Sequence, residues 1–489
     1  MSRAWTRGHG TRYERALRTC ALLSWWIGLL LAVPGILQSS SLLVTLSAIF
    51  LPLGFVLSDT SRARTGGITA MTAYSAAAVA TSFANAAALL AANTPDKALY
   101  YLYVSEPHVH VAMLLAFAAA VIPPVAFQVM SSSRTAVVLQ DLLPRVRGEI
   151  PDRQLVAGGI AIGLLAVVLH WRFPFGSLGA LSSVLFLAPM FVVFVLARAG
   201  TERDTRGALA AALVVAAAES VRALLFGYLR GDVAMPFVAF VLGALTGARS
   251  LRPLKSRAFL PVYAAAALFV IYFAAYGAIR STTPRGLQRL EAVGSYGEEM
   301  QGMPDRQDQT VLSRLTTINQ LSQVGRLVDE GGLLHGQTLE YLSYAFIPRF
   351  LWPAKPSIST TAWFALHIGL AYERPGGMIT NAINMTIPGE LYLNYGWPGV
   401  LVGLAFLGLF ISAFWRTTDF WSRPRNVLGT AFAFYLMWPW IGFSLGADLE
   451  IIVTLIAVYL LLAALGWVLP ALRLTASARR RPPVRAGLA

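Results

Sequence analysis

Charged side chains are scarce in this chain. Only 13% of its 489 residues are Asp, Glu, Lys or Arg, whereas 56% are hydrophobic and the mean hydropathy is +0.60. Soluble domains carry about 25% charged residues. The composition therefore excludes a soluble globular protein and predicts an integral membrane protein.

Cysteine and lysine are nearly absent. Cys20 is the single cysteine, so the chain cannot form an internal disulfide. Lys97, Lys255 and Lys355 are the only lysines, and the net charge of +15 comes almost wholly from arginine. These cations stand in short clusters between apolar runs, which is typical of topology signals and excludes nucleic acid as a partner. The chain also lacks the Gly-rich loops that bind nucleotide phosphates.

Long apolar runs make up most of the sequence. Each approaches or exceeds the roughly 20 residues with which a helix crosses about 30 Å of hydrocarbon. We expect an all-α polytopic membrane protein, embedded in the lipid bilayer, with about 12 transmembrane helices. The first, which follows five arginines, is interpreted as an uncleaved signal anchor. The predicted spans are 20–37, 41–58, 68–92, 109–130, 155–170, 177–199, 207–228, 234–249, 258–279, 391–414, 427–446 and 450–470.

The distribution of cations predicts the orientation of these helices. Every second loop holds at least two cations. The short loops between them hold at most one each, and their only cations are Lys97, Arg172 and Arg230. The positive-inside rule then places both termini in the cytoplasm. The expected domains are transmembrane helices 1–9 in 1–279, a large extracytoplasmic, partly helical loop in 280–390, transmembrane helices 10–12 in 391–472, and a basic cytoplasmic tail in 473–489.

The long polar segment 280–390 shows regular apolar positions, which indicate that it is folded. The helical spacing predicts an amphipathic helix from Gln309 to Asp329 and a second helical piece from Gly336 to Phe346. Three prolines in 347–356 hold the following backbone open, with two cations projecting from it. The apolar positions of the first helix are Val311, Leu312, Leu315, Ile318, Leu321, Val324, Leu327 and Val328.

Several side chains of the outer half are candidates for acid–base chemistry. Glu390 stands at the outer mouth of the tenth span, where a carboxylate flanked by Tyr and Trp could accept a proton near neutral pH. The alternative is an acid at a helix N-terminus, favoured by the helix dipole. His335 and His367 are further candidate bases, with a surface or packing role as the alternative, and Glu340 is a candidate supporting carboxylate.

Arginines on the outer side are candidates for binding an anion. Glu219 and Arg222 share one face of the seventh span, where an ion pair that braces the bundle competes with an anion site in which Glu219 orients Arg222. Arg230 lies just outside the same helix. The guanidinium fork matches phosphate oxygens, so diphosphate is the expected ligand. The remaining candidates are Arg280, Arg349 and Lys355, with interfacial snorkelling as the alternative for Arg280.

Metal ligands are weakly represented. Glu106, His108 and His110 alternate on one short stretch, but no cysteine and no further His completes a known closed site. We therefore expect no metal and no cofactor.

Two stretches give the chain a family resemblance. The sequence IPRFLWPAKP at 347–356 and the sequence GELYLNYGWPG at 389–399, together with about a dozen spans and one large late outer loop, resemble the Wzy-type O-antigen and exopolysaccharide polymerases, which are related to the O-antigen ligases. The resemblance implies a GT-C-type membrane glycosyltransferase of the bacterial plasma membrane. Such an enzyme transfers a glycan from undecaprenyl diphosphate to a lipid-linked acceptor repeat.

The resemblance also implies roles for particular residues and partners. Outward arginines would hold the diphosphate, a role that falls by position to Arg222, Arg280 and Arg349. The partners would be an undecaprenyl-diphosphate-linked oligosaccharide, a chain-length regulator and a repeat-unit flippase. Two other functions stay open, an O-antigen ligase or another polyprenyl-linked-sugar glycosyltransferase, and a twelve-helix transporter or flippase. The late, outward position of the long loop counts against the transporter.

Overall fold

The computed structural model of the chain is almost entirely helical, with one small two-stranded sheet. It describes residues 12–61, 69–92, 106–132, 143–148, 187–203, 205–226, 230–247, 316–344, 352, 360–374, 378–379, 383–420, 426–443 and 449–479, and scattered positions between 154 and 168. Arg280, Arg349 and Lys355 lie outside these ranges.

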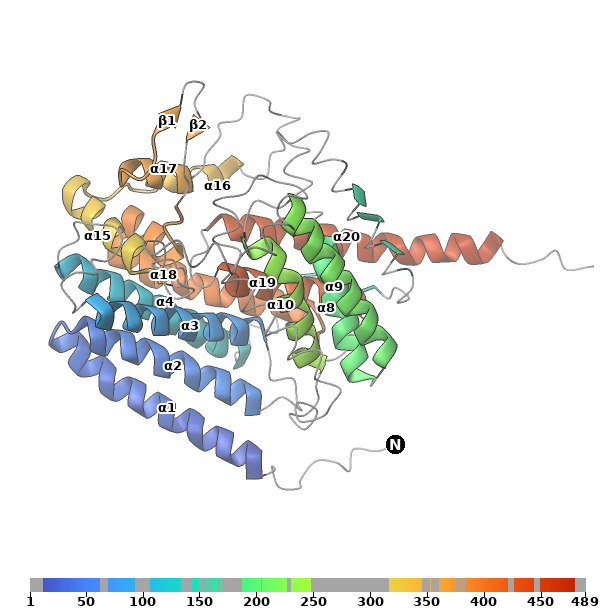
Figure 1. Cartoon of the computed structure of the whole chain (residues 1–489), viewed down its shortest axis with the longest axis horizontal. Coiled ribbons are helices and arrows are strands. Elements are labelled where there is room, and N and C mark those ends of the chain that lie inside the picture. Colours follow the sequence, from blue (N-terminus) through green and yellow to red (C-terminus); the bar gives the residue numbers. More distant parts are fainter. Residues whose placement is uncertain are drawn as a thin grey trace, which may run out of the picture.

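The helices form two groups that meet the C-terminal helices (Figure 1). In the first group each helix packs on its neighbour along the chain, and in the second group all three helices pack on one another. The first group is α1 (Arg12–Leu37), α2 (Ser41–Ser61), α3 (Ala70–Ala92) and α4 (Glu106–Ser132), and the second is α8 (Leu187–Glu202), α9 (Arg206–Phe226) and α10 (Arg230–Gly247).

Glycines allow the closest helix contacts. A Cβ atom on Gly243 or Gly247 of α10 would lie 2.4 Å from the carbonyl oxygen of Phe194 or Arg198 on α8. This four-residue spacing of small residues is a common way for membrane helices to bring their backbones together. In the same way, Gly408 of α18 (Ile387–Thr417) lies against the carbonyl oxygen of Pro123 on α4.

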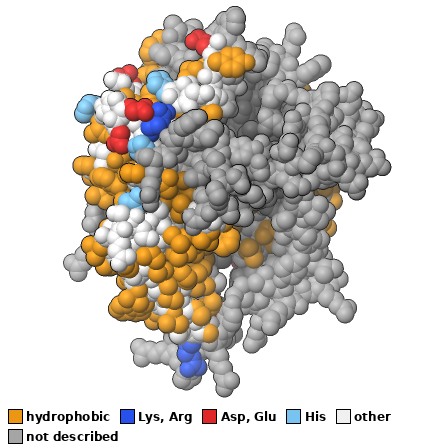
Figure 2. Space-filling view, turned by 60° about the vertical axis from the view of Figure 1, so that its left-hand side comes forward, with side chains coloured by type: hydrophobic (Ala, Val, Ile, Leu, Met, Phe, Trp, Pro, Cys, Tyr) orange, Lys and Arg blue, Asp and Glu red, His pale blue; other side chains and the backbone are white. Residues whose placement is uncertain are grey.

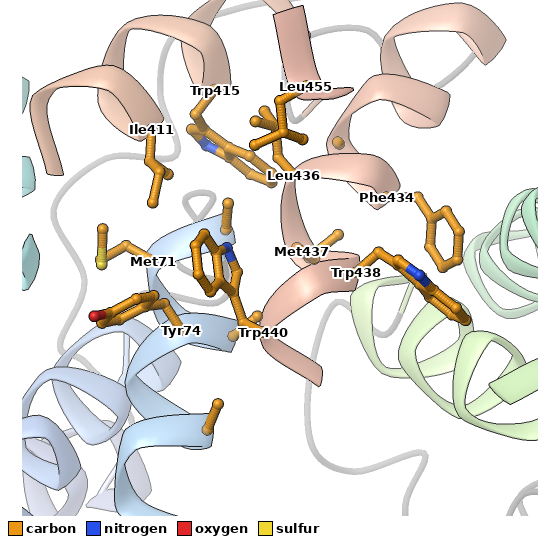
Figure 3. Packing of buried hydrophobic residues seen from close by; sticks show 14 of the residues in the cluster. Met71, Tyr74, Ile411, Trp415, Phe434, Leu436, Met437, Trp438, Trp440 and Leu455 are labelled. Carbon is orange, nitrogen blue, oxygen red and sulfur yellow. The ribbon is translucent and has the colours of Figure 1, made fainter. Parts of the chain in front are cut away.

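The core joins α3 and α18 to the last two helices, α19 (Val427–Phe443) and α20 (Glu450–Arg479). Figure 3 shows Tyr74 of α3 edge-on to Trp440 of α19, with 4.8 Å between the ring centroids. Trp415 of α18 lies close to Leu455 of α20 in the same cluster. Large aromatic side chains therefore fill the space between helices that are far apart in the sequence.

The described helices agree with most of the predicted spans. Helices α1–α4, α9, α10 and α18–α20 each cover or nearly cover one predicted span, and α8 covers the second half of 177–199. Span 258–279 lies outside the described residues, as does most of 155–170. Within the described residues, five helical stretches are long and apolar enough to cross a membrane: Glu14–Leu37, Ser41–Ser61, Ala70–Leu90, Pro107–Ser131 and Ile387–Thr417.

A small outer layer lies at the end of the bundle where α4 and α18 begin (Figure 1). Its strands pair in antiparallel fashion, with Glu373 opposite Ile379. In Figure 2, acidic, basic and histidine side chains gather at the upper left of the view, and hydrophobic side chains cover much of the described surface below them. The elements of the layer are α15 (Ile318–Gly331), η5 (Gln337–Leu339), α16 (Tyr341–Tyr344), α17 (Thr360–His367), β1 (Glu373–Arg374) and β2 (Met378–Ile379).

The amphipathic helix is confirmed, but its predicted bounds were wrong. Helix α15 begins at Ile318, because Thr316 and Thr317 bind Asn85 of α3 in a non-helical conformation, and the predicted residues 309–315 lie outside the described part of the chain. Its positions Ile318, Leu321 and Val324 are buried, as the spacing predicts. The second piece does not start at Gly336, whose φ of 96° is left-handed, but at Gln337, and it is split between η5 and α16.

A second polar cluster lies at the opposite end of α18. Arg416 donates hydrogen bonds to the last carbonyl groups of α4, including that of Ser131 at 2.6 Å. Arg147 forms an ion pair with Asp419, with 3.2 Å between Nε and Oδ2. The outer layer and these arginines are therefore separated by the length of α18, with Glu390 at one end and Arg416 at the other.

Candidate functional site

The site is built on a break in α18. Thr386 caps the helix by accepting a hydrogen bond at Oγ1 from the amide of Gly389, and Pro388 fits the first turn because its missing N–H is not needed there. Gly396 then leaves the helical conformation, with φ 63° and ψ −155°, a region open essentially to glycine alone. Pro398 lies just beyond the break, near the start of the second part.

The two parts of α18 have different surroundings. Between Ile387 and Asn394 every residue is buried except the half-buried Tyr392. After the break, Leu401, Val402 and Phe406 are 54%, 71% and 55% exposed, as expected for a surface that faces lipid. The second part alone has about 20 residues, enough to cross roughly 30 Å of hydrocarbon. The first part is therefore enclosed by protein, whereas the second part exposes apolar side chains.

Glu390 lies in the first turn of this buried part and is fully buried. Its Oε1 atom accepts a hydrogen bond of 3.4 Å from Oγ1 of Thr338, and its Oε2 atom accepts one of 3.3 Å from the amide of Leu449, just before α20. The first turn of a helix favours a carboxylate, because free N–H groups point toward it. Glu390 is thus an acid at a helix start, as one of the two sequence interpretations has it, and its role as a base stays a prediction.

Asn394, one turn later on α18, organises the polar groups around Glu390. Its Nδ2 atom donates to Oγ1 of Thr338 at 2.6 Å and to the carbonyl oxygen of Glu390 at 2.8 Å. Its Oδ1 atom accepts from the amide of Gly336 at 3.0 Å. The Asn394 amide is therefore satisfied on both sides although the residue is wholly buried.

The backbone of the outer layer binds carbonyl groups near the break. The amides of Leu334 and His335 donate hydrogen bonds of 3.0 Å to the carbonyl oxygens of Leu393 and Asn394. Because Gly396 interrupts the helix, carbonyl groups just before it need partners from outside the helix. The left-handed conformations of His335 and Gly336 turn the chain at this point, so that Thr338 reaches Glu390.

Contacts with α3 and α4 hold this layer in place. Asn85 of α3 accepts hydrogen bonds at Oδ1 from the side chain of Thr316 and the amide of Thr317, at 2.8 and 2.9 Å. His108 of α4 pairs with Asp329 of α15, with 2.8 Å between Nε2 and Oδ2. Apolar residues of α15, α17, α18 and the segment just before α18 form a separate small core, with Val324, Phe364, Met385 and Leu393 at its centre.

The three predicted bases occupy different positions. Glu390 is inside the site, and His335 contributes its backbone amide next to it while its side chain is exposed. The exposed His367 stacks on Trp363 of its own helix, with 3.9 Å between ring centroids, and its Nδ1 lies 2.8 Å from the Trp363 carbonyl oxygen. Glu340, predicted as a supporting carboxylate, is also exposed, just after η5.

Arg222 and Arg230 lie on helices of the second group, and the other predicted anion ligands lie outside the described residues. Arg222 of α9 binds Glu219 on its own helix through Nε at 2.8 Å, so the predicted ion pair is present. α9 packs mainly against α8 and α10. Arg230 is the first residue of α10. The ligand roles expected for Arg280, Arg349 and Lys355 stay predictions.

Sequence reasoning missed Thr338, Asn394 and Leu449. The spacing of Glu390 and Asn394, four residues apart in a predicted helix, was the one available signal, because such residues share a face. Nothing in the sequence pairs either residue with Thr338, since that contact depends on how the outer layer folds.

The chemistry available here is that of a buried carboxylate held by oriented hydrogen-bond donors near the start of α18. Among the described residues, no group of three or more His, Cys, Asp or Glu could hold a metal ion, and His108 binds Asp329 instead. Comparison of the chain with protein-family models, with curated proteins and with solved structures finds no match.

Proposed function

We propose that this chain is a polymerase of polysaccharide repeat units at the outer face of a bacterial plasma membrane. It transfers a glycan chain from undecaprenyl diphosphate to the sugar of an incoming lipid-linked repeat unit. The observation that supports this most directly is the position of Glu390, a buried carboxylate just beyond the membrane-spanning part of α18. A substrate anchored by its lipid tail carries its sugars at that depth.

In the proposed reaction Glu390 is the base. A hydroxyl oxygen of the acceptor sugar attacks the anomeric carbon of the donor glycan, and its proton moves to the Glu390 carboxylate. The bond between the anomeric carbon and the diphosphate oxygen breaks, and its electron pair leaves with undecaprenyl diphosphate. The bond energy comes from a donor that is already activated, so the transfer needs no nucleotide.

The leaving diphosphate needs cations. Arg222, Arg280, Arg349 and Lys355 are the proposed ligands, because fixed cations stabilise the negative charge that develops on the leaving group. Replacement of Arg349 or Arg222 by Ala is then expected to abolish long chains while lipid-linked single repeats remain. Normal amounts of long chains in both variants would refute this assignment.

Burial of Glu390 has a consequence for the catalytic cycle. The acceptor reaches the carboxylate only after a neighbouring segment has moved. The segment that carries Thr338 is attached to α18 by a few hydrogen bonds at the break, whereas α18 itself is packed along α4. We therefore propose that residues 333–338 open to admit the acceptor and then close again, which returns Thr338 to Glu390 before the proton is transferred.

Glu390→Gln tests the proposal. The amide keeps the size of the side chain but cannot act as a base, so we expect chain growth to stop and lipid-linked single repeats to accumulate. Glu330→Gln is the matched control, because Glu330 is an exposed carboxylate of the same outer layer and we assign it no role. Long chains at the normal level in the Glu390 variant would show that the base lies elsewhere.

One observation favours a second function. Discontinuous helices with buried polar residues are typical of transporters, where they form a site near the bilayer midplane. The break at Gly396 lies near the start of α18, so the polar cluster is displaced from the midplane, which favours the enzyme. Lipid analysis of a deletion strain separates the candidates, because a polymerase defect leaves single repeats, a ligase defect leaves long lipid-linked chains, and a flippase defect leaves substrate on the inner leaflet.

A further inference from the structure

The hydrogen bonds of Asn394 fix the direction of a neighbouring hydroxyl group. The Oδ1 atom of Asn394 accepts from the Gly336 amide, so its Nδ2 atom supplies the two remaining hydrogens. One goes to the Glu390 carbonyl oxygen, at 2.8 Å, and the other to Oγ1 of Thr338, at 2.6 Å. A flipped amide would place Nδ2 against the N–H of Gly336, so the assignment follows from the contacts.

The Thr338 hydroxyl consequently has one hydrogen to donate, and that hydrogen points toward Glu390. Its Oγ1 atom uses a lone pair for Asn394, and the carboxylate oxygen Oε1 of Glu390 lies 3.4 Å away. The amide of Leu449 donates to the other carboxylate oxygen. Thr338 and Asn394 are both buried, so little water competes for these positions.

We propose that Thr338 and Asn394 are positioning residues for Glu390. Asn394 orients the Thr338 hydroxyl, and the hydroxyl in turn holds the Glu390 carboxylate in one plane and favours its ionised form, which is the form that accepts a proton. This inference rests on the proposed function, because it concerns the same site. It adds that the ability of Glu390 to accept the proton depends on Thr338, a residue of the outer layer 52 positions away in the sequence.

Thr338→Val and Thr338→Ser form the test pair. Valine keeps the shape of threonine but has no hydroxyl, whereas serine keeps the hydroxyl. Chain growth is measured in membranes, with the lipid-linked repeat unit extracted from a deletion strain as substrate. We expect Val to lower kcat about tenfold or more, with KM for the repeat unit unchanged, and Ser to stay within about threefold of the wild-type kcat.

Asn394→Ser is the second variant, because it removes the donor that orients Thr338 without touching the hydroxyl itself. It is expected to lower kcat in the same way as Thr338→Val. Thermal unfolding of all three variants in detergent accompanies the kinetics. A purely structural role would lower the unfolding temperature of the Val and Ser variants alike and would not be rescued by serine.

The results separate the positioning role of Thr338 and Asn394 from the role of Glu390 as the base. Wild-type kcat in Thr338→Val, equal losses in Val and Ser, or failure of both Thr338→Val and Asn394→Ser to fold would overturn the positioning role. In that case Glu390→Gln still decides the proposed function. If Glu390→Gln itself is fully active, the base assignment fails, whatever the Thr338 variants do.

Discussion

Asn394 of α18 donates a hydrogen bond of 2.6 Å to Thr338, 56 positions earlier in the chain. The contact joins the outer layer to the buried first part of a helix that continues into the membrane. Together with the backbone bonds from Leu334 and His335, it makes the outer layer and the start of α18 one folded unit. The carboxylate of Glu390 lies inside this unit.

Gly396→Ala is expected to disturb the break in α18. A side chain at φ 63° and ψ −155° costs about 1–3 kcal/mol, and relief of this strain would straighten the helix and pull Asn394 away from Thr338. We expect both a lower unfolding temperature and a loss of chain growth. Gly207→Ala on α9 is the control, since a Cβ there meets nothing within 4 Å. Equal activity of the two variants would show that the break is not required.

Gly336→Ala is expected to loosen the outer layer. The residue has a φ of 96°, where a side chain costs roughly 1–2 kcal/mol, and the new Cβ would lie 2.4 Å from the hydroxyl of Tyr395. The unfolding temperature in detergent should fall, and Tyr395→Phe should restore part of it by removing that hydroxyl. Gly331→Ala, on the helical end of α15 with open space around it, should be neutral or slightly stabilising. The same unfolding temperature for the Gly336 and Gly331 variants would contradict the prediction.

Asn85→Leu is expected to detach the start of α15 from α3. The change leaves the Thr317 amide and the Thr316 hydroxyl without their acceptor, at about 1–3 kcal/mol for each buried group. Limited proteolysis should then cut segment 316–344 faster than in the wild type. Ser82→Ala is the matched control on the same helix, because the buried Ser82 hydroxyl has no hydrogen-bond partner among the described residues. Faster cleavage of both variants would point to a general loss of stability.

Periodic features of the sequence predicted much of the fold. Apolar runs predicted most of the described helices, since length and hydropathy alone decide whether a helix crosses a bilayer. The spacing of Ile318, Leu321 and Val324 predicted the buried face of α15, because residues three positions apart lie on the same side of a helix. Glu390 stood out because a carboxylate next to an apolar run needs an explanation.

Features that depend on single contacts could not be predicted. The start of α18 at Ile387, four residues before the predicted span, follows from the Thr386 cap. The break at Gly396 could have been suspected from the Gly-Trp-Pro sequence, but a conformation with positive φ is not encoded in periodicity. Thr338 and Asn85 act through partners more than 50 residues away, and only the folded structure brings such partners together.

The central claim is that the outer layer faces the exterior. It is tested most directly with single cysteines in a Cys20→Ser background, because Cys20 is the only native thiol. Glu330→Cys places a thiol on the exposed side of α15, and Arg145→Cys places one at the opposite end of the bundle, at a residue that is 44% exposed. A membrane-impermeant maleimide should label the first variant in intact spheroplasts and the second only after the membrane is opened. Labelling in the reverse order would contradict the account.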